Sequence, residues 1–402
     1  MTRILIVSPF VPFPPDRGHR VRTFWLMRQL ALQYRVALVT QCFDAGERRA
    51  VADLQRAFPA LDPVVAVDSF AHRTRLHRLA YAAGTRIVAL GGLPRERIYH
   101  SSPAMQRAVD RVMAEWLPSL VQGEYWFSRW TIRPRAGVPV WIDSHDLHWL
   151  RLQRELATQA HPWRRWILRR RAQVIQANEL AAYRSAGRVL TVHEVESERL
   201  RSCLGAVPVS TVPIACEVLP APSGVPLGKT VLFLGALDYL PNRDALLFLA
   251  REIMPGVRLA VPSSALRVVG HRAGVRGLPV DQWIHYAGHM PDLAVAAEGV
   301  GAAVAPLRMG AGTSVKVLTL LSLGMPLVAS SRAVEGLALL EGQHYLRADD
   351  AASASRAVIS LLANPQAGRE LGCRGREAAL RLFDWRQTAP EVLRTYEEGL
   401  RS

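Results

Sequence analysis

The stretch from residue 301 to 336 constrains the fold more than any other part of the chain. It opens with an apolar run, residues 302–307, which is typical of a strand buried on both faces of a parallel sheet. A glycine-rich turn at 310–312 precedes a helix predicted from residue 313 to about 323, and a second apolar run follows at 326–330. Strand, glycine-rich loop, helix and strand in this order predict a βαβ unit.

The loop of this unit has the features of an anion site. Gly310 and Gly312 let the backbone approach a ligand closely, and Thr313 or Ser314 can cap the helix. Helix N-termini carry free N–H groups and favour negative charge. Lys316, one of only two lysines in the sequence, lies in the first turn of this otherwise apolar helix. We predict a diphosphate site here; the alternative is a structural βαβ unit whose Lys316 reaches solvent.

The same pattern begins the chain and restarts after residue 228. Apolar runs at 3–8 and 35–40 flank an amphipathic helix, and a similar run occurs at 230–235. The segment between the two patterns, 208–228, is rich in proline and glycine, which is typical of a boundary. A chain of 402 residues also suffices for two domains. We therefore predict an α/β fold with two doubly wound, Rossmann-like domains: residues 1–207 and 229–385, a linker at 208–228 and a final helix at 386–402.

Polar groups follow two predicted strands of the first domain. Gly18 lies in the loop after the first strand, and a later strand ends at Asp143, followed closely by His145, Asp146 and His148. Ligands of doubly wound sheets bind beyond the carboxyl ends of the strands. We predict a functional role for these residues, with the acidic residues and His148 on the acceptor side. A turn glycine and a structural histidine remain the alternatives.

The sequence PLRMGAGTSVKVLTLLSLGMPLVASSRAVEGL, residues 306–337, resembles the donor-binding segment of GT-B glycosyltransferases in the large retaining family four, the glycosyl transferases group 1. The pattern P-x-x-x-G-x-x-x-R after the first strand and the terminal FDWRQTAPEVLRTYEEGL are also similar to this family. The resemblance implies two domains facing a cleft, with the last helix returning to the first domain.

The resemblance also implies an activity. Such an enzyme moves a sugar from a nucleoside-diphosphate-sugar to an acceptor hydroxyl with retention, needing no metal and no cofactor beyond the nucleotide-sugar co-substrate. The acceptor would be a glycan, a lipid-linked or a small molecule, in polysaccharide, glycolipid or other glycoconjugate synthesis. A non-catalytic partner subunit and a nucleotide-sugar epimerase on the same fold are the alternatives.

By the resemblance, His145 contacts the donor sugar and Lys316 stabilises the leaving diphosphate. Further donor-binding residues would be Gly18, Asn242, Arg308, Gly310, Gly312, Thr313, Ser314 and Thr319. The sequence departs from the family at two places, because glutamates usually stand where this chain has Ala311 and Thr319. A threonine accepts hydrogen bonds from ribose hydroxyls more weakly than a glutamate.

The formal charge of +16 suggests an anionic partner. No nucleic-acid-reading motif accompanies the charge, so we expect no nucleic-acid partner. The basic segment at 72–78 predicts a solvated helix face or part of an acceptor or membrane surface. HPWRRWILRRR, residues 161–171, fits either a core helix with inward tryptophans or a helix lying on an anionic membrane.

Four scattered cysteines predict reduced thiols. The first apolar run is too short for a signal peptide and is broken by prolines, and no uncharged run is long enough to span a bilayer. We expect a cytoplasmic protein that associates peripherally with the inner face of the membrane.

Overall fold

The computed structural model describes residues 2–69, 94–159, 161–219, 228–272, 274–290 and 292–401. The chain divides into two compact units, Met1–Ala215 with Thr388–Ser402, and Cys216–Gln387. The basic segment at 72–78 lies outside the described residues.

The first unit is built on a seven-stranded sheet in the order β3-β2-β1-β4-β5-β6-β7, and every described pairing in it is parallel. The strands are β1 (Arg3–Ser8), β2 (Arg35–Cys42), β3 (Leu61–Asp68), β4 (Leu120–Glu124), β5 (Val140–Asp143), β6 (Arg188–Thr191) and β7 (Val209–Thr211). The helices are α1 (Gly18–Leu30), α2 (Ala45–Ala57), α4 (Arg95–His100), α5 (Pro103–Trp116), α6 (His148–Thr158), α7 (Pro162–Arg184) and α8 (Glu194–Leu204), with a 3₁₀ turn, η2 (Trp126–Thr131). Residues Ile4 to Val7 of β1 are fully buried, as a central strand covered on both faces must be.

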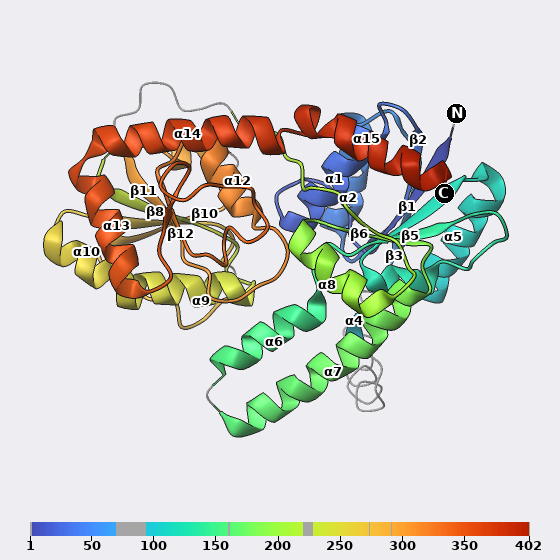
Figure 1. Cartoon of the computed structure of the whole chain (residues 1–402), viewed down its shortest axis with the longest axis horizontal. Helices are drawn as coiled ribbons and strands as arrows, with labels where there is room; N and C mark the ends of the chain where they lie inside the picture. Colours follow the sequence, from blue (N-terminus) through green and yellow to red (C-terminus); the bar gives the residue numbers. More distant parts are fainter. Residues whose placement is uncertain are drawn as a thin grey trace. The chain divides into compact units, whose positions relative to one another are not determined.

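The second unit holds a six-stranded sheet in the order β10-β9-β8-β11-β12-β13, again parallel. Its strands are β8 (Thr230–Leu234), β9 (Ala265–Val269), β10 (Ile284–Gly288), β11 (Val300–Ala305), β12 (Leu327–Ala329) and β13 (Leu346–Arg347). Its helices are α9 (Leu240–Phe248), α10 (Met254–Ala260), α11 (Leu293–Ala296), α12 (Val315–Ser322), α13 (Ala351–Ala363) and α14 (Pro365–Phe383), with a π turn, η3 (Leu249–Ile253), between α9 and α10. Helices α12 and α14 cover one face of this sheet, and α9 and α10 lie on the other (Figure 1).

A close backbone contact fixes α12 in this unit. A side chain at Gly372 of α14 would place its Cβ 2.1 Å from the carbonyl oxygen of Gly324, the residue that follows α12. Gly324 itself adopts a φ of +70°, which favours glycine. The two glycines therefore hold the C-terminal end of α12 against α14, and the N-terminal end of α12 is left at the edge of the sheet where ligands bind.

The final helix, α15 (Trp385–Arg401), packs on the first unit although it follows the second in sequence. Gln29 donates a hydrogen bond to the Thr388 hydroxyl at 2.7 Å, and Tyr396 donates one to Gln122. The ring of Tyr396 lies 5.2 Å from that of Trp141. The helix therefore completes the core of the first unit.

Two sequence predictions differ from the structure. The linker does not begin at residue 208, because Val209–Thr211 pairs with β6 as a seventh strand and the first unit extends to Ala215. The interpretation of residues 161–171 as a core helix with inward tryptophans is wrong, because Trp163 and Trp166 are 61% and 70% exposed.

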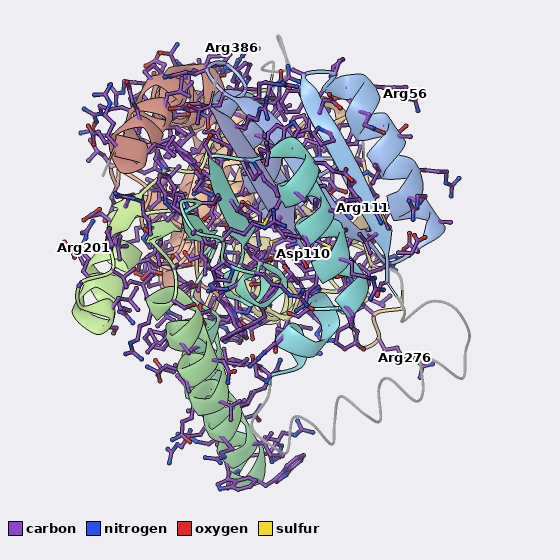
Figure 2. All side chains as sticks on the ribbon, turned by 90° about the vertical axis from the view of Figure 1, so that its right-hand side faces the viewer. Arg56, Asp110, Arg111, Arg201, Arg276 and Arg386 are labelled. Atoms are coloured by element: carbon purple, nitrogen blue, oxygen red, sulfur yellow. The ribbon has the colours of Figure 1, made fainter. Side chains whose placement is uncertain are left out.

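The charge of the protein is spread over many elements. Arg56 projects from α2, Arg111 from α5 and Arg201 from α8 (Figure 2). The four cysteines are unpaired. Among the described helices, none has the length and apolar character that crossing a membrane would need.

Candidate functional site

The loop between β11 and α12 keeps the shape predicted for an anion site. Gly310 and Gly312 adopt φ values of +128° and +69°, which residues with a side chain rarely do. The hydroxyl oxygens of Thr313 and Ser314 are buried and have no hydrogen-bond partner among the described residues. Ser314 occupies the cap position of α12, yet its hydroxyl makes no capping hydrogen bond, so the predicted capping role is wrong. Two unpaired hydroxyls at a helix N-terminus leave donors available for an anion.

Lys316 lies beside this loop and points into the second unit. Its ammonium group donates a hydrogen bond to the side-chain oxygen of Asn242 and lies 5.8 Å from the centre of the Phe233 ring. Burial lowers the pKa of Lys316 to about 7. Among the described residues no carboxylate forms an ion pair with this lysine, so an incoming phosphate would supply the missing negative charge.

Asn242 brings a second βα connection to the same place. It lies in the first turn of α9, after β8, and its amide donates to the backbone oxygen of Ala236 at 2.8 Å. A side chain at Gly235 would put its Cβ 2.9 Å from the Asn242 amide. The loops after β8 and β11, which are neighbouring strands, therefore converge on Lys316 as the sequence predicts for a doubly wound sheet.

Two other predicted donor residues are already engaged within the protein. Arg308 makes two hydrogen bonds to Asp244, at 2.6 and 3.0 Å, and its guanidinium lies 4.6 Å from the centre of the Phe248 ring. The hydroxyl of Thr319 donates to the carbonyl of Val315, one turn earlier in α12, at 3.1 Å. A ligand that used either side chain would have to compete with these partners.

In the first unit, His145 belongs to a buried polar cluster. Its Nε2 lies 2.6 Å from Oε2 of Glu124, and its ring stacks on Tyr125 with the centroids 4.2 Å apart. Both His145 and Tyr125 adopt positive φ values, +57° and +65°, which non-glycine residues seldom do. Glu124 also accepts from Thr23 at 2.8 Å and from Gln122 at 2.7 Å.

Glu124 is a member of this cluster that the sequence analysis missed. It ends β4 directly beside Asp143 at the end of β5. The available signal was a carboxylate at the carboxyl end of an apolar strand, the same signal that identified Asp143. Because Glu124 holds the ring of His145, it is a positioning residue for the histidine.

Asp143 was predicted to face the acceptor, and this prediction is wrong. It is fully buried, and its Oδ2 accepts from Nε of Arg22 at 2.9 Å. Arg22 also donates to the backbone oxygens of Val212 and Pro213, at 2.6 and 2.9 Å. Asp143 therefore anchors α1 and the chain after β7 to the sheet.

Asp146 and His148 are close together, with 3.2 Å between Oδ1 and Nε2. Burial opposes the charge of His148, but Asp146 outweighs it and raises the pKa of His148. The other ring nitrogen of His148 accepts from Trp126 at 3.3 Å. Gly18 begins α1 at the surface, at the edge of the sheet where β1 ends.

One group of side chains has the donor atoms for a cation. Glu124, Asp143 and His145 each offer one ligand atom, and these atoms lie within 4.8 Å of one another. The carboxylates already accept hydrogen bonds from Arg22, Thr23 and other donors, so a cation would have to displace these partners.

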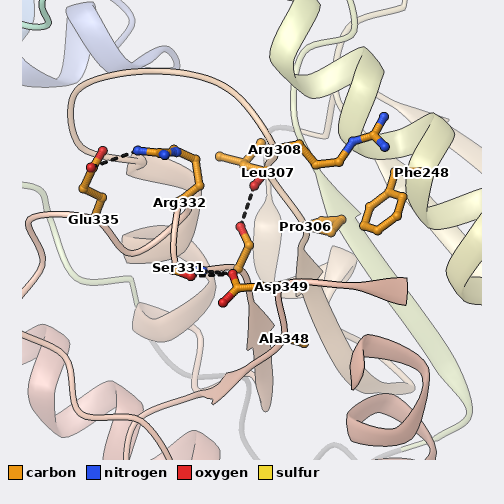
Figure 3. Close-up of a pocket in the computed structure, with 10 residues that line it drawn as sticks. Phe248, Pro306, Leu307, Arg308, Ser331, Arg332, Glu335, Ala348 and Asp349 are labelled. Carbon is orange, nitrogen blue, oxygen red and sulfur yellow. Dashed lines mark hydrogen bonds and ion pairs between the residues drawn. The ribbon is translucent and has the colours of Figure 1, made fainter. Parts of the chain in front are cut away.

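A cavity of about 420 Å³ opens in the second unit at the ends of β11, β12 and β13 (Figure 3). Its wall includes Phe248, Arg308, Ser331, Glu335 and Asp349. Asp349 accepts from the backbone N–H of Ser331 at 2.7 Å. Among the predicted donor residues, Arg308 alone lines it, so the cavity adjoins the donor loop rather than containing it.

Part of the second unit is similar to a known protein family. Residues 228–364 match the family model of glycosyl transferases group 1. No curated protein sequence matches the chain.

Solved structures match along the whole chain. Sucrose-phosphate synthase from Thermosynechococcus elongatus is 18% identical, with a TM-score of 0.70 and 99% of each chain covered. TarM of S. aureus is 9% identical, with a TM-score of 0.70 and 100% of each chain covered. HepE of Anabaena, in complex with UDP-glucose, is 11% identical, with a TM-score of 0.68 and 99% of this chain and 100% of that chain covered. The chain thus has the GT-B fold of these structures, and residues 228–364 of its second unit are similar to glycosyl transferases group 1.

Proposed function

We propose that the protein transfers a sugar from a nucleoside-diphosphate-sugar to an acceptor hydroxyl, with retention of the anomeric configuration and without a metal. The observation that carries the proposal is the donor loop of the group 1 domain. Its buried Thr313 and Ser314 hydroxyls have no partner among the described residues, and Lys316 has no counter-ion there. A diphosphate has the charge and the acceptor oxygens that such a site lacks.

The proposed chemistry rests on electrostatic stabilisation of the leaving group. As the bond from the sugar to the diphosphate breaks, negative charge grows on the phosphate oxygens. Lys316 and the N–H groups at the start of α12 stabilise that charge without needing to reorganise. The departing phosphate accepts the proton of the acceptor hydroxyl, so no separate protein base is needed. By the resemblance, His145 contacts the donor sugar, and Glu124 fixes its ring.

UDP-sugars are the first donors to test, because HepE has been solved with UDP-glucose and with UDP and glucose, and TarM with UDP and a glycosylated glycerol. We propose an acceptor that is a glycan or a lipid-linked molecule in polysaccharide or glycolipid synthesis. The reaction would take place in the cytoplasm, at the inner face of the membrane.

Calorimetric titration of UDP and UDP-glucose into three forms of the protein tests the donor site. Lys316→Met should lower affinity by about ten- to a hundredfold, since a charge-assisted hydrogen bond to phosphate is lost. Lys229→Met is the matched control, because Lys229 is the other lysine of the chain and is exposed. Equal affinity in all three folded proteins would remove Lys316 from the site. The stereochemical part is checked by the anomeric proton signal of the first product in NMR.

A non-catalytic GT-B partner subunit is the second candidate. It is favoured by Thr319, whose hydroxyl is bonded to its own helix where relatives usually carry a glutamate. A partner subunit need not bind a nucleotide, so an absence of binding across a panel of nucleotide-sugars would favour it. Turnover of the donor without any acceptor would instead indicate an epimerase.

A further inference from the structure

Helices α6 and α7 form a hairpin that extends away from the sheet of the first unit (Figure 1). The base of the hairpin is firmly packed, since Leu150, Leu152, Ala172 and Ile175 belong to one buried cluster. The carboxylate of Glu179 in α7 accepts from the backbone N–H groups of His148 and Trp149, each at 3.2 Å, at the start of α6. The hairpin is therefore a fixed part of this unit.

The first turns of α7 carry an exposed apolar face. Trp163, Trp166 and Ile167 are 61%, 70% and 47% exposed. With 100° per residue, they lie on one side of the helix, and Ala172 and Ile175, which are buried, lie on the opposite side. The tryptophans thus point away from the buried side of the helix. Such exposure of large apolar side chains at helical spacing marks an interaction surface.

The residues around this apolar face are strongly cationic. Residues 148–171 contain seven arginines and a single acidic residue, Glu155. Arg164, Arg165, Arg169 and Arg170 are exposed, and no carboxylate of the described residues pairs with them. The guanidinium of Arg164 lies 5.0 Å from the centre of the Trp163 ring. Indole rings flanked by arginines are the composition of helices that lie at the surface of anionic lipid.

We propose that this tip, Pro162–Arg170, docks the protein on an anionic phospholipid bilayer. Trp163, Trp166 and Ile167 enter the headgroup region, and the arginines bind lipid phosphates. Charge complementarity selects this occupant over a neutral protein face, because no carboxylate in the described part of the chain pairs with the four arginines. The inference rests on the proposed function in one respect. If the protein transfers a sugar, docking on the bilayer makes a membrane-held molecule the acceptor.

Co-sedimentation of the full chain with vesicles tests the docking. The protein should bind vesicles of phosphatidylcholine mixed with phosphatidylglycerol and remain unbound with phosphatidylcholine alone. Binding should weaken steeply as salt screens the arginines. Trp163→Ser with Trp166→Ser should lower partition by on the order of tenfold for each indole removed. Arg164→Glu with Arg165→Glu should lower it by at least about fivefold for each residue.

The matched control is Arg107→Glu with Arg111→Glu on α5, which makes the same change of net charge at exposed positions of the same unit. Its binding should equal that of the unaltered chain. If this control lost vesicle binding as strongly as Arg164→Glu with Arg165→Glu, net charge alone would explain the loss, and the proposal would be overturned. Full binding by the tryptophan variant would also overturn it, as would a concentration-dependent dimer that the same substitutions dissolve in the absence of lipid.

The docking and the proposed function fail separately. The tryptophan variant should still bind a nucleotide-sugar in solution, and Lys316→Met should still sediment with anionic vesicles. Transfer to a lipid-linked acceptor in vesicles should fall in the tryptophan variant, whereas transfer to a short water-soluble acceptor should not. Equal loss with both acceptors would contradict a docking role.

Discussion

In the proposed donor site Lys316 would need its charge to bind a diphosphate, yet its surroundings disfavour that charge. Burial lowers its pKa from the ordinary 10.5 to about 7, so near neutral pH a substantial fraction of the unliganded protein carries a neutral lysine. A bound diphosphate reverses this balance and takes up a proton on the lysine. The donor site is thus linked to pH through a single side chain.

We predict that donor affinity falls as the pH rises through about 7 and that this slope disappears in Lys316→Met. Titrations in buffers of different ionisation enthalpy would also detect the proton uptake. The stability of the folded state should change with pH in the opposite direction to donor affinity. Between about 7 and 10.5 the unfolded chain binds more protons at this lysine, so its burial costs less stability as the pH rises. A pH-independent affinity in the unaltered protein would contradict a role for the Lys316 charge.

Glu124 leads to a second prediction at the scale of one residue. Replacing it by glutamine keeps the volume but removes the negative charge that holds Nε2 of His145. Transfer should fall by about ten- to a hundredfold, the usual cost of a hydrogen bond to a charged group. The calorimetric affinity for UDP should stay unchanged. Thr23→Val removes another partner of Glu124 and leaves the contact with His145, so it should retain most of the activity.

Thr319 tests the resemblance where the sequence departs from the family. Its hydroxyl is bonded to Val315, so it offers little to a ribose. A glutamate there could accept from both ribose hydroxyls, and we predict that Thr319→Glu tightens donor binding by about 1–2 kcal/mol in titration calorimetry. A folded variant that binds every nucleotide-sugar more weakly would show that the pocket suits a different donor.

At the scale of elements, sequence patterns predicted the parts whose causes are local. The donor loop could be predicted from its glycines and from the apolar runs on both sides. Asn242 could be predicted from its position at the start of another βα connection. The three residues of β7 are too few to show a pattern, so they were assigned to the linker. The sequence could not link Glu124 to His145, because the two residues come together only through the pairing of β4 with β5 in the folded sheet.

The first turns of α7 show a different limit of prediction from sequence. Spacing alone identifies an apolar stripe at Trp163, Trp166 and Ile167, and the stripe fits a core or a free surface equally well. The decision depends on a second stripe, Ala172 and Ile175, which lies on the opposite side of the helix and belongs to the buried cluster of the first unit. Both stripes belong to one helix of 23 residues, so a window short enough to find one of them misses the other.

The junction of these two helices carries a prediction at this scale. Burial raises the pKa of Glu179 to about 7, against the opposing effects of His148 and the Tyr183 hydroxyl. A carboxyl whose pKa is raised in the folded state contributes stability that is present below 4.5 and is lost as the pH rises through about 7. Urea unfolding should therefore show falling stability over that range. In Glu179→Gln this contribution should not change with pH. An identical pH dependence of stability in both proteins would contradict the raised pKa of Glu179.

At the scale of the whole molecule, the chain leaves the first unit after Ala215 and returns to it at Thr388. The return depends on the last helix, α15, whose Val392 and Tyr396 are fully buried. A side chain at Gly399 would place its Cβ 2.5 Å from the ring of Trp141, so the helix lies directly on β5. The stability of the first unit thus depends on residues that follow the second unit in the sequence.

We predict that Tyr396→Ala lowers the stability of the first unit by about 3–5 kcal/mol, the usual cost of truncating a buried aromatic side chain. Tyr396→Phe, which removes only the hydrogen bond to Gln122, should cost about 1 kcal/mol. Because the donor loop belongs to the other unit, UDP should bind both variants with unchanged affinity. Eight of the ten tryptophans belong to the first unit, so tryptophan fluorescence reports mainly on that unit. Denaturation followed by this fluorescence and by UDP binding should therefore separate into two transitions in Tyr396→Ala, with most of the tryptophan signal lost first. A single transition that carries UDP binding down with it would mean that the two units unfold as one.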